Sequence, residues 1–443
     1  MDAPREKWHS RFGFILAAAG SAVGLGNIWK FPYITGENGG AAFLLLYLGI
    51  VFTIGLSVLL AEVALGRAGQ TDAFSAFKAL GHKGWTVVGA LGLTIAFLIL
   101  SFYSVIAGWT IAYVIKSANG AFSGLDIGAV GDSFVGFISN PWQPLLYQAL
   151  FVVLTVFVVL KGVASGIERV SKILMPVLFL ILLALVARSV TLSGAEKGLR
   201  FFLSPDFSKI DGTIFMAALG QAFFSLSIGM AAMLTYGSYL DSGTRIGRSA
   251  WYIVSLDTMV AVLSGLAILP AVFAFGLDPE AGPALTFITL PTVFQAMPGG
   301  LIFGPAFFVL LLIAALTSSV SLLEPLVAVL CDRGFGRVQA TIGIGMVIFL
   351  LGVPSSLSQG IWADYKIFGM AFLDLLDFLT ANIMLPISGL MVAIFVGWVM
   401  GPRAANEVTV DGEHPGILLT LWIFILRFIA PVAILAILIN GLM

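Results

Sequence analysis

The sequence predicts an all-α integral membrane protein of eleven transmembrane helices. Hydrophobic residues make up 59% of the 443 residues and only 10% are charged. Apolar stretches long enough to cross a bilayer, about 20 residues each, recur along the whole chain. Because a soluble domain carries about 25% charged residues, most soluble classes are excluded. A net charge of −1 without a basic block also excludes nucleic acid and leaves the lipid bilayer as the main partner.

The apolar stretches divide the chain in order into eleven spans. No loop between them is long enough for a soluble domain, so residues 1–443 are predicted to form a single domain. The two longest gaps, 117–143 and 188–212, mix Gly, Pro, Ser, Asp and Lys, which is typical of loops with short surface helices. The predicted spans are 11–36, 41–67, 84–116, 144–161, 166–187, 213–240, 246–276, 300–331, 336–353, 365–399 and 415–441.

The distribution of basic residues predicts the orientation in the membrane. Most Lys and Arg residues of the loops fall on the side that holds the N-terminus, among them Arg5, Lys7, Arg11 and Lys78. The positive-inside rule therefore places the N-terminus in the cytoplasm. An odd number of spans then puts the C-terminus outside, in a multi-pass protein of the cell (inner) membrane.

Two sets of five spans predict an inverted repeat. Repeat one (10–187, spans 1–5) and repeat two (213–399, spans 6–10) have similar lengths, and an odd number of spans inverts the second set, while span 11 (415–441) is additional. Each set opens with an interrupted helix, because Gly and Ser fall near the middle of spans 1 and 6. Backbone groups freed at membrane depth need partners, so such breaks indicate a ligand site. Close helix packing through small residues is the alternative for either segment alone.

Charged residues inside the spans indicate function by default, since each costs on the order of 3 kcal/mol on insertion scales. Glu62 and Glu324 are expected to accept hydrogen bonds from the backbone of the broken helices. Asp374 and Asp377 share a helical face and need a cation, for which Lys30 is the candidate. Arg427 is expected to snorkel or to bind lipid headgroups. The complete set is Lys30, Glu37, Glu62, Asp257, Glu324, Asp374, Asp377 and Arg427.

The chain carries no enzyme signature. His9, His82 and His414 are far apart in sequence, and none lies in an HExxH pattern. Gly24 and Gly26 are followed by no third glycine and preceded by no predicted strand, so a dinucleotide fingerprint is excluded. The protein is therefore not expected to be an enzyme.

Several motifs resemble the neurotransmitter:sodium symporter family, in particular its bacterial members. Residues 20–32 (GSAVGLGNIWKFP) and 37–40 (ENGG) resemble the family's first-span signature. Further matches are 221–229 (QAFFSLSIG), 235–239 (TYGSY), 316–319 (LTSS) and the pair Asp374 and Asp377. The resemblance implies a LeuT-type transporter domain, with ten helices in two inverted repeats, broken helices 1 and 6, and here one extra span. It also implies sodium-coupled symport of an amino acid by alternating access.

The resemblance implies two sodium sites and no organic cofactor. The first, completed by the substrate carboxylate, is implied at positions matching Ala22, Asn27, Ser225 and Asp257. The second is implied at the backbone carbonyls and hydroxyls of Gly20, Val23, Ala314, Thr317 and Ser318. Oxygen donors suit a hard cation, although hydroxyls in an apolar helix can also bond their own backbone.

The implied substrate is a neutral, hydrophobic L-amino acid. Its carboxylate is expected near the amides of Leu25 and Gly26 and the hydroxyl of Tyr103, because a half-helix N-terminus favours negative charge. Monoamine carriers of the family have Asp at the position of Gly24, so Gly24 implies a substrate with its own carboxylate. Since Met230 can repack, aromatic side chains are included. The remaining substrate contacts are expected at Ala22, Ile99, Phe224, Ser225, Ser227, Met230, Ser318 and Leu322.

Alternating access implies gates on both sides. On the outside, Lys30 is expected to pair with Asp377, although Lys lacks the bidentate fork of the Arg found in many relatives. Span 5 carries Gly166 and Pro176, which resembles a family feature that unwinds this span, with a proline kink as the alternative. The inner gate is expected to consist of Arg5 paired with Asp332, supported by Trp8, Ser238 and Tyr239.

Transport is expected to be independent of chloride. Chloride-dependent relatives use a serine four residues after the position of Asp257, and here that position is Ala261. Asp257 supplies a fixed negative charge instead and is a candidate to take up a proton after sodium leaves.

Two alternatives stay open beside the sodium-coupled carrier. One is a non-transporting, sodium-dependent amino-acid sensor of the same fold, against which the short loops count. The other is a proton-coupled carrier, in which a cation usually replaces the second sodium, and none is expected beside Thr317 and Ser318.

Overall fold

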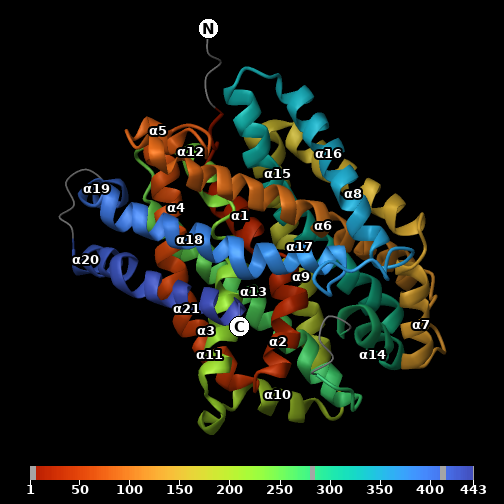
Figure 1. The fold of residues 1–443 in the computed structure, drawn as a ribbon. Coiled ribbons are helices and arrows are strands. Elements are labelled where there is room, and N and C mark those ends of the chain that lie inside the picture. Colours follow the sequence, from red (N-terminus) through yellow and green to blue (C-terminus); the bar gives the residue numbers. More distant parts are fainter. Residues whose placement is uncertain (1–5, 280–284, 410–415, 443) are drawn as a thin grey trace.

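The computed structural model describes residues 6–279, 285–409 and 416–442. Within these ranges every regular element is a helix, and one isolated β-bridge joins Ile367 and Met370. Nine of the described helices are long and apolar enough to cross a membrane, and a tenth span is bent. The all-α prediction is therefore confirmed, and Figure 1 shows the helices gathered in one bundle.

The first five spans follow the predicted order. They consist of α1 (Arg11–Ala22), η1 (Gly26–Lys30) and α2 (Phe31–Glu37); α3 (Ala41–Ile50), η2 (Val51–Gly55) and α4 (Leu56–Gly69); α6 (Thr86–Ala118); α8 (Gln143–Leu160); and η4 (Val163–Glu168) and α9 (Arg169–Val190).

Five further spans follow, after the pair of shorter helices at the position of predicted span 6. In order, the pair and these spans consist of α11 (Gly212–Ser225) and α12 (Ala232–Ser238); α13 (Ile246–Ala274); α15 (Gly300–Asp332); α16 (Arg337–Leu357); α17 (Phe372–Phe378), η7 (Leu379–Met384), α18 (Leu385–Ile394) and η8 (Phe395–Met400); and α20 (Ile417–Phe424), η9 (Ile425–Ile429) and α21 (Ala430–Leu442).

Both predicted breaks are present. Span 1 bends by 51° between α1 and η1. Span 6 is interrupted between α11 and α12, where Ser227, Gly229 and Ala231 have positive φ angles of 54°, 85° and 61°. An L-residue with a side chain rarely adopts this backbone, so a helix cannot continue through it. Neither α11 nor α12 is long enough to span a bilayer alone, which is why span 6 exists only as the pair.

The two broken spans lie at the centre of the bundle. In Figure 1, α2 and α11 run toward the lower end, whereas α1 and α12 lie near the upper end that holds the N-terminus. The two longest helices, α6 and α15, pack along each other, and α15 also packs against α1. The breaks are thereby enclosed by protein rather than lipid, as freed backbone at membrane depth requires.

Short helices cover the lower end in Figure 1. The two longest predicted loops contain α7 (Ile127–Ile138) and α10 (Ala195–Leu203), as expected. The pair η6 (Leu285–Thr289) and α14 (Leu290–Ala296), between spans 7 and 8, was not predicted. The boundaries of the two inverted repeats, 10–187 and 213–399, stay predictions.

The remaining helices are short connectors: α5 (Ala76–Ala79), η3 (Lys83–Trp85), η5 (Phe207–Lys209) and α19 (Pro402–Val408).

Candidate functional site

Hydroxyl groups satisfy the carbonyls that the bend in span 1 frees. Ser318 Oγ lies 3.0 Å from the carbonyl oxygen of Ser21, 3.3 Å from that of Val23 and 3.4 Å from that of Gly20. Ser227, in the break of span 6, donates a second hydrogen bond to Ser21 O at 2.9 Å. The two breaks therefore contact each other directly.

The amide side of the same bend faces α6. Leu25 N donates to Tyr103 Oη at 3.5 Å, and Gly24 N donates to Asn27 Oδ1 at 3.2 Å. Gln221 Nε2 on α11 donates to Gly26 O at 2.8 Å. Of the groups predicted for the carboxylate, Leu25 N and Tyr103 Oη thus lie next to each other, and Gly26 follows Leu25 in the chain.

A buried polar cluster lies beside the bend. Asn27 Nδ2 donates to Ser225 Oγ at 2.9 Å and to Asp257 Oδ1 at 2.8 Å. Ser225 Oγ donates to Asp257 Oδ2 at 2.8 Å, and Tyr47 Oη donates to Ser225 Oγ at 3.3 Å. All four side chains are at most 1% exposed. Among the described residues, no Lys or Arg forms an ion pair with Asp257, so its charge is uncompensated by a basic side chain.

The other predicted sodium ligands gather where α1 crosses α15. Thr317 Oγ1 lies 3.1 Å from Ile313 O and from Ala314 O of its own helix. A Cβ added at Gly20 would lie 3.2 Å from Thr317 Cβ, so the two helices approach closely at this glycine. Ala22 and Val23 are buried in the same region.

The predicted substrate contacts line the breaks with apolar side chains. Ile99, Met230 and Leu322 are each at most 5% exposed and belong to one buried hydrophobic cluster. Phe224 is packed so closely that a Cβ added at Gly26 would lie 3.0 Å from its ring. These side chains therefore form an apolar wall beside the polar bend.

The two buried glutamates, Glu62 and Glu324, have different kinds of hydrogen-bond partner. Glu62 Oε1 accepts a hydrogen bond of 2.6 Å from Gly229 N in the break of span 6, which confirms the expectation. For Glu324 the expectation is wrong, because it accepts hydrogen bonds from Tyr239 Oη at 2.7 Å and Arg337 Nη2 at 2.5 Å. Its position near the end of α15, two turns beyond Thr317, brings it next to the start of α16 rather than to a broken helix.

The predicted outer ion pair is not formed in this structure. Lys30 Nζ lies 4.4 Å from the centroid of the Phe224 ring, and in the described part of the chain it forms no ion pair with Asp377. The ammonium of Lys is attracted to the face of an aromatic ring about as strongly as to a carboxylate. The guanidinium of Arg could instead bind both oxygens of the carboxylate.

The end of the bundle that holds the N-terminus, which is predicted to be the inner end, is closed by the segment before α1. Trp8 is 8% exposed and donates through Nε1 to Tyr236 O at 2.9 Å and through its backbone N to Tyr239 O at 3.3 Å. Asp332 accepts hydrogen bonds from Thr71 Oγ1 at 3.2 Å and Asp72 N at 2.8 Å. Arg5, its predicted partner, lies outside the described residues. The predicted support Ser238 is buried on α12 and donates to Thr235 O at 2.6 Å.

A charged network at the inner end was missed by sequence reasoning. Arg337 donates to Glu324 and, at 3.1 Å, to Glu6, so it joins the N-terminal segment to spans 8 and 9. Exposed Lys7 forms an ion pair with Asp241. Glu6 and Arg337 are separated by 331 residues, so sequence spacing gives no sign of their contact. The one available signal was Glu324, an acid inside span 8 that needs a basic partner.

Span 5 is attached to the same segment. Glu168, 1% exposed in η4, accepts hydrogen bonds from His9 N at 2.8 Å and Ser10 Oγ at 2.9 Å. The chain from Gly166 to Pro176 is helical here, and Pro176 lies inside α9. The predicted unwinding of span 5 stays a prediction.

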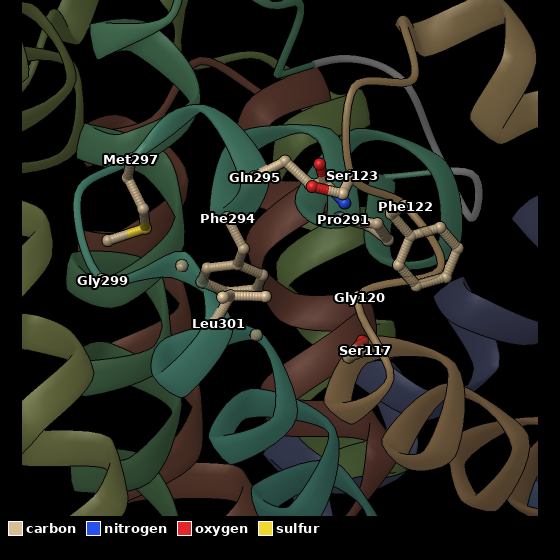
Figure 2. A pocket seen from close by; sticks show the side chains of 12 residues that line it. Ser117, Gly120, Phe122, Ser123, Pro291, Phe294, Gln295, Met297, Gly299 and Leu301 are labelled. Atoms are coloured by element: carbon tan, nitrogen blue, oxygen red, sulfur yellow. The ribbon is translucent and has the colours of Figure 1, made fainter.

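A separate cavity of about 310 Å³ lies at the far end of α6 from the inner network (Figure 2). It is formed between the end of α6, the segment 120–123, α14 and the start of α15. Figure 2 shows Gln295 directed toward Ser123, with Phe294 and Leu301 facing the cavity from α14 and α15. None of the predicted site residues lines this cavity.

Two broken helices that face each other inside a bundle of apolar spans define a membrane transporter of the LeuT fold. The crystal structure of MhsT in complex with L-phenylalanine superposes with a TM-score of 0.91 and 47% identity, covering 99% of this chain and 100% of that one. The sodium-dependent transporter YhdH of Bacillus subtilis is 43% identical over 98% of this chain and 97% of its own length. A sodium-dependent transporter of Haemophilus influenzae is 37% identical over 99% of this chain and 98% of its own.

The sequence pattern of the sodium:neurotransmitter symporter family matches residues 5–124 and 134–443. The chain belongs to this family. It is therefore a multi-pass membrane protein and a sodium-dependent symporter, not an enzyme.

Proposed function

We propose that the protein imports neutral, hydrophobic L-amino acids by alternating access, coupled to two sodium ions and independent of chloride. The observation that carries the proposal is the bend at residues 23–25, which presents amides, carbonyls and an acidic cluster to one buried point. Import is proposed because sodium flows inward down its electrochemical gradient. The proposed orientation has the N-terminus in the cytoplasm and the C-terminus outside the inner membrane.

The first sodium ion is proposed at the cluster of Asn27, Ser225 and Asp257, with the carbonyl of Ala22. Three side chains within 2.9 Å of one another offer oxygen to a hard cation. The charge of Asp257 is balanced by sodium because the described residues supply no basic partner. Tyr47 donates a hydrogen bond to Ser225 Oγ, and Gln221 donates one to Gly26 O. Both are therefore proposed as positioning residues.

The second sodium ion is proposed between α1 and α15. The Ser318 hydroxyl lies within 3.4 Å of the carbonyl oxygens of Gly20 and Val23. A sodium ion bound here would replace these hydrogen bonds and be coordinated by the same hydroxyl and carbonyl oxygens. Thr317 and the carbonyl of Ala314 complete this set.

The substrate carboxylate is proposed at the amides of Leu25 and Gly26 and at Tyr103 Oη, beside the first sodium. A Cβ at Gly24 would lie 2.5 Å from Ser318 Oγ, so an acidic side chain has no room there and the substrate must bring its own carboxylate. The first sodium and the carboxylate then bind cooperatively, because each compensates the charge of the other.

The substrate side chain is proposed to contact the apolar wall. The proposed contacts include no charged residue, so the desolvation of a charged substrate side chain among them would be unfavourable. The phenylalanine named with MhsT fits this chemistry. The proposed contacts are Ala22, Ile99, Phe224, Ser225, Ser227, Met230, Ser318 and Leu322.

Chloride independence is proposed from Asp257 and Ala261. Ala261 is fully buried one turn along α13 from Asp257 and has no hydroxyl for an anion. Asp257 already supplies a negative charge beside the first sodium, and it is also the candidate for proton uptake on the return of the empty carrier. An Asp257→Ala variant that kept its sodium affinity and its indifference to chloride would contradict both statements.

The proposed cycle opens and closes gates at the two ends of the broken helices. Lys30 and Asp377 belong to the outer gate, and Arg5, Trp8, Asp332 and Tyr239 belong to the inner gate. Two sodium ions crossing a tenfold gradient and 100 mV release about 7 kcal/mol, which sustains accumulation on the order of 10⁵-fold.

The test is uptake of a panel of neutral amino acids by proteoliposomes under an imposed sodium gradient, with gluconate in place of chloride. Uptake of the hydrophobic members is expected. A requirement for chloride contradicts the assignment of Asp257. Sodium-dependent binding without uptake favours the sensor, and uptake driven by a proton gradient alone favours the proton-coupled carrier.

A further inference from the structure

A basic residue in the last span remains outside the proposed transport site. Arg427 lies in η9, the π-helical turn between α20 and α21, with apolar neighbours on both sides in sequence. An arginine inside a span faces a partner or a water-filled cavity, because its charge is costly in hydrocarbon.

Two contacts fix the orientation of this guanidinium. Arg427 Nε donates to Gly397 O at 2.7 Å, and its Cζ lies 5.2 Å from the ring centroid of Trp398. A Cβ at Gly397 would lie 3.3 Å from Arg427 Cγ, so glycine permits the close approach. Across the described residues, the two Nη groups have no hydrogen bond or ion pair. The four N–H donors of these two groups are therefore available to a ligand.

The arginine lines a cavity of about 350 Å³ between α19 and span 11. Ala405 of α19 lies on one side, and Thr420, Phe424 and Phe428 of span 11 lie on the other. Phe424 and Phe428 are 50% and 48% exposed, so the cavity continues onto a surface that faces lipid. Glu407, the one acid of α19, is already bound by Arg67 at 2.9 Å.

We propose that this cavity binds one anionic phospholipid, with its phosphate on the Nη groups of Arg427 and an acyl chain along Phe424 and Phe428. A planar guanidinium matches two phosphate oxygens, and exposed aromatic rings suit an acyl chain. A second copy of this chain is a poorer occupant of the cavity. Residues 417–441 contain no acid, so pairing this face with itself would bring two arginines together.

The experiment is native mass spectrometry of the purified full chain with phosphatidylglycerol or phosphatidylcholine of identical acyl chains. For the first bound lipid, a preference of about tenfold for phosphatidylglycerol is expected. Arg427→Gln should abolish the preference, and Arg427→Lys should retain part of it because the charge remains without the fork. The matched control is Arg248→Gln, which removes an exposed arginine on α13 and should keep the full preference.

Three results would overturn the proposal: equal binding of the two lipids by the unmodified chain, an undiminished preference in Arg427→Gln, or displacement of the lipid by excess inorganic phosphate. If Arg427→Gln does not fold, Ala405→Phe replaces it, since this change fills the cavity and keeps the arginine. Loss of the preference in Ala405→Phe supports the site, and its retention contradicts it. Because the readout is lipid binding, it is independent of the proposed transport activity.

Discussion

The two ends of the broken helices are closed by different kinds of contact. At the inner end, buried Trp8 donates two hydrogen bonds and Arg337 joins two glutamates. At the outer end, Lys30 lies over the partly buried ring of Phe224. Removing one partner of a buried ion pair costs about 3–5 kcal/mol, whereas a cation–π contact contributes about 0.5–2 kcal/mol, depending on its burial. The outer end should therefore open at a lower cost than the inner end.

Arg337→Gln should have the largest effect on this difference. The change leaves Glu324, which is fully buried, without its cation, and should weaken the inner closure by about 3 kcal/mol. We would measure alkylation of a Thr235→Cys reporter, buried on α12, in a chain whose one cysteine is replaced by Cys331→Ser. Alkylation should accelerate on the order of 100-fold.

The matched control for that experiment is Lys7→Gln. It removes an exposed ion pair with Asp241 at the same end, and such pairs contribute about 0–1 kcal/mol. Equal acceleration by both variants would show that the buried network is not what closes the inner end.

Trp8→Phe should have an intermediate effect. An aromatic ring remains to pack against Tyr236 and Tyr239, but the hydrogen bond from Nε1 to Tyr236 O is lost. A buried hydrogen bond contributes about 1 kcal/mol, so the same reporter should be alkylated about fivefold faster. An unchanged rate would assign the role of Trp8 to packing alone.

Lys30→Gln should have a smaller effect, and at the opposite end. Loss of the contact with Phe224 should accelerate release of bound L-phenylalanine by about twofold to fivefold, because the ring is freed to move. Alkylation of Thr235→Cys should stay unchanged. A change at the inner reporter would mean that the two ends are not closed independently.

Asp377→Asn should have the smallest effect. Since Asp377 forms no ion pair with Lys30 in the described structure, its neutralisation should alter the release rate by less than about twofold. A change as large as that of Arg337→Gln would show that the pair forms when the outer end closes, and the contrast between the two ends would be lost.

The sequence predicted what depends on local pattern. Span lengths, the two breaks and the polar residues Asn27, Ser225 and Asp257 stand out because Gly, Ser and charged side chains are conspicuous in apolar helices. The resemblance to the family then grouped these residues, which lie far apart along the chain. The polar residues beside the bend do converge in space, although their roles remain proposals.

The residues that were missed depend on tertiary packing. Tyr47 lies in an apolar run and is directed toward Ser225 only through the packing of α3 against α11. Arg337 stands at a predicted span boundary, where a basic residue ordinarily faces water, and Glu324 was assigned to the wrong partner for the same reason. For Lys30, the sequence could not distinguish an acidic partner from the ring of Phe224.

The most direct test of the central claim is the linkage between sodium and substrate binding. The dissociation constant of L-phenylalanine would be measured at low and at saturating sodium, and that of sodium with and without phenylalanine. If the substrate carboxylate and Asp257 share the first sodium ion, both affinities should rise by the same factor, about tenfold or more, and Asp257→Ala should remove the coupling. Phenylalanine binding with equal affinity at both sodium concentrations would contradict the account.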